Sequence, residues 1–344
     1  MIKIKLYELD IHRNECTFRP FLWAQNALRE IGIEFTQGNS YDFAWVAQAS
    51  FLNKKLPLKE SVNNGLEFLS KITGDYMLID GQDSTSLIGA YEVFKESNAL
   101  LLLKNVLLKD RSLYKQGSVL GRHYWGKGDY KLEDFDDYSS RIVLSGTNWL
   151  STHWAGVNIQ YFPIKRPRRY DISAMFQYPS TIESYEHGKI QSKYYDSHRK
   201  IGMDALMKTK YKISSLTNGE RIPKEEYYQR MFDSKIVFAP FGYGAIAIRD
   251  LEAAIQGSVL LKPDVSFVDT APNVFVDGET YIACKHDFSN LEEKLGEILG
   301  DSEKYLYIAE NARKKFEEEI RPEKLALHLY KTLKRLENIE QVKV

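Results

Sequence analysis

The chain has few cysteines, no excess charge of either sign and no long apolar run. Of its 344 residues only Cys16 and Cys284 are cysteine, and they lie far apart, so neither a disulfide framework nor a cysteine-ligated metal site has support. Lysine plus arginine equals aspartate plus glutamate at 47 each, so no global field draws the chain to nucleic acid or to an anionic membrane. No run reaches the roughly 18 apolar residues of a membrane span, and the N-terminus lacks the apolar region of a signal peptide. We therefore expect a cytoplasmic protein with no nucleic-acid partner and no transmembrane segment, and peripheral membrane association stays open.

The length indicates two domains of ordinary size, because 344 residues is more than twice a typical domain length. A hydrophobic content of 43% and a charged content of 27% are typical of globular chains that can bury a core. We place a first domain at residues 1–164 and a second at residues 165–325. A C-terminal helix at residues 326–344 could pack back across the first domain.

The most informative stretch runs from residue 234 to residue 264 and predicts a strand, a glycine turn, a helix and a second, parallel strand. Pro240 ends the first strand, and Gly242 and Gly244 flank Tyr243 in a turn where positive φ is expected. The helix is predicted from about residue 245 to residue 256, with Gly257 as its C′ residue. Such a unit offers its helix N–H groups to an anion, although a strand, a turn and a helix also occur in any doubly wound protein.

The pattern P-x-G-x-G, then R-x-x-E-A, then G-x-V-L resembles the donor-site segment of GT-B glycosyltransferases, and it is closest to their exostosin-like branch. This resemblance implies an α/β fold with two Rossmann-like domains facing a cleft. It also implies that Glu252 holds the ribose of a nucleotide and that the glycine turn, with Arg249, faces the diphosphate. The basic run His198-Arg199-Lys200, on a predicted helix, could clamp a diphosphate or could simply solvate a helix face. The likeness covers the second half of the chain well and the first half faintly.

The first half offers polar groups where predicted strands end, which is where α/β sites gather. A predicted strand at residues 2–8 is followed by a polar loop that contains His12. Asp80 and Asp83 stand in a loop after a second predicted strand, and each could serve as a general base, a metal ligand or a helix N-cap. We rank Asp83 above Asp80 and His12 as the base, and we assign no metal.

The basic run K-R-P-R-R at residues 165–169 is interpreted as a solvated linker.

Together, the resemblance and the residues predict a transferase of polysaccharide biosynthesis. It would move a sugar from a nucleotide-diphosphate sugar to a glycan or another hydroxyl acceptor, with no cofactor and no metal. The first domain would bind the acceptor and the second the nucleotide sugar. Two alternatives stay open, namely a nucleotide-sugar epimerase on the same scaffold and a non-catalytic protein that binds nucleotide or glycan.

Overall fold

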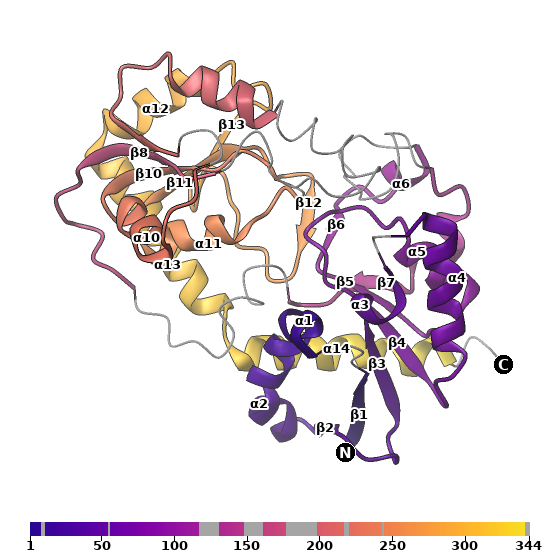
Figure 1. The fold of residues 1–344 in the computed structure, drawn as a ribbon. Coiled ribbons are helices and arrows are strands. Elements are labelled where there is room, and N and C mark those ends of the chain that lie inside the picture. The colour runs from indigo at the N-terminus through magenta and orange to yellow at the C-terminus, as the bar shows by residue number, and fades with distance from the viewer. Residues whose placement is uncertain are drawn as a thin grey trace. The chain divides into compact units, whose positions relative to one another are not determined.

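The computed structural model describes residues 1–7, 11–53, 56–116, 131–147, 161–176, 198–216, 220–242 and 244–340. The chain divides into two units, each built on its own sheet (Figure 1). The first unit contains residues 1–157, 268–272 and 320–344, and the second contains residues 158–267 and 273–319. The predicted fold class of two Rossmann-like α/β domains is confirmed, because both main sheets are parallel and carry helices.

The sheet of the first unit has the order β2-β1-β3-β4-β5-β7, and all of its neighbouring strands are parallel. Its strands are β1 (Ile2–Tyr7), β2 (Ile33–Thr36), β3 (Phe43–Ala47), β4 (Tyr76–Asp80), β5 (Leu102–Lys104) and β7 (Ile142–Leu144). Trp45 and Ala47 belong to one core cluster, while Ala44 and Val46 alternate with them and are equally buried. Both faces of the sheet are therefore covered, as expected for a parallel sheet.

The helices of the first unit are α1 (Ile11–Trp23), α2 (Gln25–Glu30), α3 (Gln48–Phe51), α4 (Leu58–Leu69), α5 (Ala90–Glu96), α6 (Leu113–Gln116), α7 (Phe135–Ser139) and α14 (Pro322–Glu340). Phe18 and Phe21 of α1 share a core cluster with Leu325 and Leu329 of α14. The C-terminal helix thus packs on the first unit, and it begins at Pro322, earlier than the predicted start at residue 326.

A short antiparallel pair joins β6 (Val106–Leu108) to β12 (Val268–Thr270). Residues 268–272 therefore belong to the first unit, although they lie between two strands of the second in sequence. We had placed all of residues 165–325 in the second domain, and this part of the prediction is wrong. A single domain boundary misses this pairing, because its partners lie 160 to 164 residues apart in the sequence and no local pattern encodes it.

The sheet of the second unit has the order β13-β11-β10-β8-β9, again parallel throughout. Its strands are β8 (Tyr170–Ala174), β9 (Ile213–Ser215), β10 (Ser234–Phe238), β11 (Val259–Pro263) and β13 (Ile282–Cys284). Its helices are residues 198–206, α10 (Lys224–Phe232), α11 (Ile248–Ile255), α12 (Leu291–Leu299) and α13 (Ser302–Glu319). If these five strands are numbered by their order in the chain, their order across the sheet is 2-1-3-4-5. The winding therefore reverses between β8 and β10, and ligands of such sheets bind at that reversal.

The basic run at residues 165–169 is not a solvated linker, because two of its arginines hold the second unit together. The Arg168 guanidinium donates to the carbonyl oxygens of Ser234 and Gly257 at 2.7 and 2.6 Å. Arg166 donates to the carbonyl of Gln256 at 2.7 Å and lies over the ring of Phe232. Phe232 ends α10 and Gln256 follows the last residue of α11, so these cations sit at the negative ends of two helix dipoles.

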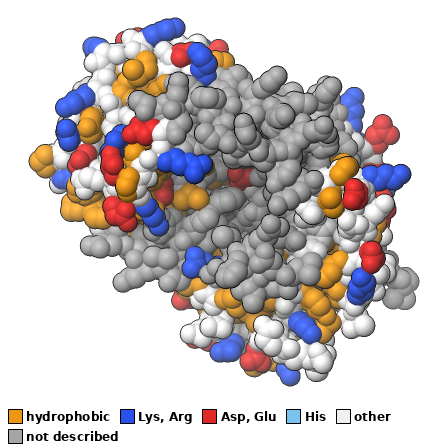
Figure 2. Space-filling model, viewed as in Figure 1, with side chains coloured by type: hydrophobic (Ala, Val, Ile, Leu, Met, Phe, Trp, Pro, Cys, Tyr) orange, Lys and Arg blue, Asp and Glu red, His pale blue; other side chains and the backbone are white. Residues whose placement is uncertain are grey.

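The exposed charges show no single-sign field on the face drawn in Figure 2, where basic and acidic side chains are interspersed over the described surface. Within the described ranges, every helix is too short or too polar to cross a bilayer.

Candidate functional site

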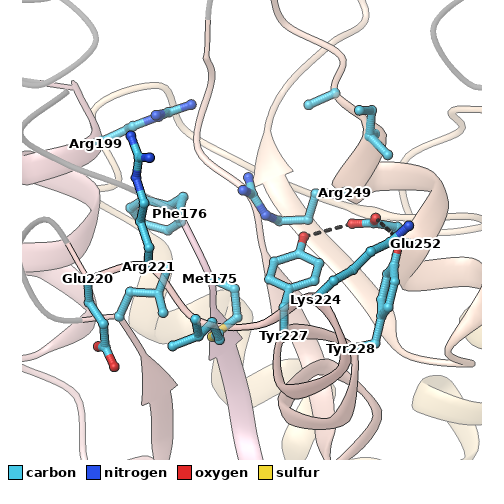
Figure 3. A pocket seen from close by; sticks show the side chains of 14 residues that line it. Met175, Phe176, Arg199, Glu220, Arg221, Lys224, Tyr227, Tyr228, Arg249 and Glu252 are labelled. Carbon is cyan, nitrogen blue, oxygen red and sulfur yellow. Dashed lines mark hydrogen bonds between the residues drawn. The ribbon is translucent and has the colours of Figure 1, made fainter. Parts of the chain in front are cut away.

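A pocket of about 640 Å³ opens in the second unit at the carboxyl ends of its strands (Figure 3). Met175 and Phe176 follow β8, Leu216 follows β9, and Arg249 and Glu252 come from α11, the helix after β10. The pocket therefore lies where the winding of the sheet reverses between β8 and β10. The topology alone makes this the first place to look for a ligand.

The loop from β10 to α11 differs in two respects from the turn that the sequence predicts. The helix begins at Ile248 rather than near residue 245, and Ala247 is its N-cap residue. Positive φ occurs at Gly257, as predicted, but the backbone of Gly242 is not in the left-handed region. Tyr243 lies outside the described residues. Gly242 is needed for the close approach of another side chain rather than for positive φ.

Gly242 makes room for Arg199, because a Cβ atom built on it would lie 2.9 Å from Nη2 of that arginine. Arg199 stands on the helical segment 198–206, some forty residues earlier in the chain, and lines the pocket. The structure thus brings together Gly242 and Arg199, which the sequence suggested separately.

A buried ion pair fixes the segment in front of α11. Lys262 of β11 donates to the carboxylate of Asp250 and to the carbonyl oxygen of Ala245, and both charged side chains are almost fully buried. Asp250 also accepts the backbone N–H of Ala247 at 3.0 Å, which caps the helix in place of an N-cap side chain. Burial lowers the pKa of the Lys262 ammonium. Asp250 at the third helical position is a capping signal that can be seen in the sequence, whereas its pairing with Lys262 was not predicted.

Glu252 is held by two phenols from α10. The hydroxyl of Tyr227 donates to Oε2 at 2.7 Å, and the hydroxyl of Tyr228 donates to Oε1 at 3.1 Å. Only 6% of the glutamate is exposed. Burial raises the pKa of the Glu252 carboxyl, and the two phenols and Arg249 partly offset this effect. Neither tyrosine was predicted as a site residue, because tyrosines in an amphipathic helix are ordinary packing residues.

The described lining carries four cationic side chains, Arg199, Arg221, Lys224 and Arg249, against two carboxylates, Glu220 and Glu252. Arg249 lies 5.8 Å from the ring centroid of Phe176, and its buried Nε has no hydrogen-bond partner among the described residues. In the view of Figure 3 its guanidinium stands between Arg199 and Glu252. Clustered cations beside an apolar wall suit a ligand that is anionic at one end and flat and apolar at the other.

In the first unit, Asp80 is the last residue of β4 and is fully buried. Its Oδ2 lies 3.1 Å from Nζ of Lys104, its register partner on β5, and its Oδ1 accepts the N–H of Gln82 at 3.0 Å. Asn105 donates to the carbonyl oxygen of Gly81 at 2.9 Å. Asp80 and its neighbours therefore hold the start of the loop that carries Asp83, and they leave Asp80 without access to a substrate.

Asp83 lies half-buried in that loop and is the first-unit carboxylate that we retain as a candidate base. Asp83 is not the N-cap of α5, because that helix is capped at Gly89, whose N–H donates to Glu92 at 2.6 Å.

His12 lies within α1 and not in a polar loop, so this prediction is wrong.

No cluster of three or more histidine, cysteine, aspartate or glutamate side chains within the described ranges could hold a metal ion.

No protein-family model and no curated protein matches this chain. The chain is similar to several solved structures. Sucrose-phosphate synthase from Thermosynechococcus elongatus is 11% identical, with 98% of this chain and 100% of that chain covered, at a TM-score of 0.48. HepE from Anabaena, solved in complex with UDP, is 11% identical over 97% and 100%, at 0.42. A Listeria monocytogenes protein assigned as a UDP-N-acetylglucosamine 2-epimerase is 12% identical over 96% and 94%, also at 0.42. At these values the likenesses carry no argument about activity.

Proposed function

We propose that this protein is a glycosyltransferase that uses a nucleotide-diphosphate sugar as donor and a hydroxyl group, most simply that of a glycan, as acceptor. The observation that carries the proposal is the pocket of the second unit, where a buried glutamate and a group of cations line the switch point of a doubly wound sheet. No cofactor is needed for this transfer.

The donor would bind with its ribose at Glu252 and its diphosphate among Arg199, Arg249 and the backbone around Gly242. A carboxylate has about four acceptor positions, and the two phenols use one on each oxygen of Glu252. One acceptor position per oxygen remains, which matches the two hydroxyls of a ribose diol. Met175, Phe176 and Leu216 would form the apolar wall for the base.

The chemical step needs a leaving-group site and a base. In a direct displacement the acceptor oxygen forms a bond to the anomeric carbon as the bond from that carbon to the diphosphate oxygen breaks. The acceptor proton passes to a carboxylate, for which we propose Asp83 of the first unit. The nucleoside diphosphate leaves as an anion, and the cations of the pocket would stabilise its developing charge without a metal ion.

Calorimetry with UDP, GDP and ADP tests the donor site. We expect one of them to bind, and both Glu252→Gln and the 2′-deoxy form of that nucleotide to weaken binding. The loss of a hydrogen bond to a charged group is worth about 1.5–3 kcal/mol, or roughly ten- to a hundredfold in affinity. Glu225→Gln is the matched control, because Glu225 is an exposed carboxylate on α10 outside the pocket lining. Unchanged affinity in Glu252→Gln would remove the glutamate from the site.

Product analysis separates the reaction classes. A panel of nucleotide sugars is incubated with and without an acceptor mixture. Transfer requires the acceptor, epimerisation proceeds without it, and a binding protein turns nothing over. Sugar conversion without an acceptor would overturn the proposal in favour of an epimerase.

A further inference from the structure

The contact between α10 and α11 suggests a role for two residues that line the pocket without carrying a charge. Tyr227 and Tyr228 are consecutive, and neighbouring helical side chains usually diverge by about 100° around the axis. Here both hydroxyls reach one carboxylate, and their rings meet edge to face with centroids 5.4 Å apart. Packing alone does not require two phenols to converge on the same buried glutamate.

We propose that Tyr227 and Tyr228 are positioning residues that keep Glu252 ionised and aimed at the ribose diol, so that the nucleotide site stays competent in mildly acidic conditions. This proposal rests on the proposed donor site. Tyr227 and Tyr228 act through the glutamate.

The electrostatic reasoning starts from the burial of Glu252. An uncompensated carboxylate at 6% exposure would take up a proton, and a protonated carboxyl cannot accept a hydrogen bond at both oxygens in the same way. Two phenol donors favour the charged form, and burial raises the pKa of both phenols, so they remain protonated donors. The other groups that face Glu252 are Lys224 on α10 and Arg249 on its own helix, both positive charges that act in the same direction.

The test is the affinity for the best-binding nucleoside diphosphate as a function of pH, in the wild type and in Tyr227→Phe, Tyr228→Phe and the double variant. In the wild type, affinity should be lost as the pH is lowered and Glu252 takes up a proton. Removing one phenol should move the midpoint of this loss to a pH that is higher by about one to two units, the shift that a hydrogen bond to a charged group implies. At high pH, where Glu252 is ionised without help, each variant should recover to within about tenfold of the wild type, the remaining loss reflecting the side-chain ordering that the phenols provided. Glu252→Gln is the control, because without the carboxyl the loss of affinity at low pH should disappear.

Two outcomes would overturn the proposal, and a third would overturn the proposed function instead. If the tyrosine variants keep the wild-type pH profile, the phenols do not control Glu252. If affinity is lost at every pH together with a lower melting temperature, the tyrosines are structural. If the wild type binds no nucleoside diphosphate, the proposed function fails instead. The ¹³C titration of the Glu252 carboxyl in the free protein then still tests whether the phenols lower its pKa.

Discussion

The contact between Gly242 and Arg199 gives a prediction that isolates the phosphate end of the proposed donor site. In Gly242→Ala the new methyl group would lie 2.9 Å from Nη2 of Arg199, which is closer than Cβ atoms approach other heavy atoms in real proteins. The arginine must therefore move. Because the clashing atom is the tip of a flexible side chain, the movement should change the fold very little.

The expected magnitude follows from the loss of one charge-assisted contact to the diphosphate. Such a contact is worth about 1.5–3 kcal/mol, so the affinity for a nucleoside diphosphate should fall roughly ten- to a hundredfold. The affinity for the corresponding nucleoside, which lacks phosphate, should stay the same, since Glu252 and the apolar wall are untouched.

The assay is calorimetry with both ligands, alongside a thermal melt. Arg199→Ala and the double variant complete a cycle: if Gly242→Ala acts through the arginine, it should add nothing once Arg199 is gone. Gly296→Ala on α12 is the matched control, because its Cβ would meet only the Tyr211 hydroxyl at an ordinary 3.6 Å.

Normal diphosphate affinity in Gly242→Ala would refute the placement of the phosphates beside this loop. Equal weakening of nucleoside and diphosphate binding would refute the assignment of Arg199 to the phosphates.

Two further predictions concern the first unit. Asp83→Asn should bind the donor normally but lose about 10²–10⁴ in turnover, as expected for removal of a general base, and near-normal steady-state rates would exclude it. Burial lowers the pKa of His328, whose Nε2 donates to the carbonyl oxygen of Leu144 at 2.8 Å, so the unfolded chain takes up a proton that the folded chain resists. The stabilisation is complete above the ordinary histidine pKa of about 6.5 and is lost as pH falls below it. The free energy of unfolding, measured in urea, should therefore decrease as the pH falls below this value, and His328→Gln should make the decrease smaller. An equally steep decrease in that variant would contradict the reasoning.

The sequence by itself determined much of the second unit, because its signals are local. The apolar run of β10, the helix after it, the C′ glycine and the parallel return strand all follow from period and end signals within thirty residues. At Gly257 the backbone has φ of +62°, and the N–H groups of Gly257 and Ser258 bond to Ala254 and Ala253, as the predicted helix end requires. The strand that ends in Asp80 was also readable, since four apolar residues precede a polar turn.

Only the tertiary structure decided which polar groups meet. Glu252 could be predicted from its motif, but its pairing with Tyr227 and Tyr228 depends on how α10 packs against α11. A strand and a loop separate these helices in the sequence, so the periodicity of either helix does not show which of its faces meets the other. Asp80 and Lys104 resemble surface residues in the sequence, yet they are register partners in the interior of a parallel sheet. The interpretation of the K-R-P-R-R run as a linker was wrong for a related reason: its charges indicate a solvated segment, whereas the fold brings the carbonyl ends of α10 and α11 within reach of Arg166. Sequence patterns record each segment's own geometry, and the partners of a charged or polar group are set by which segments come to lie against it.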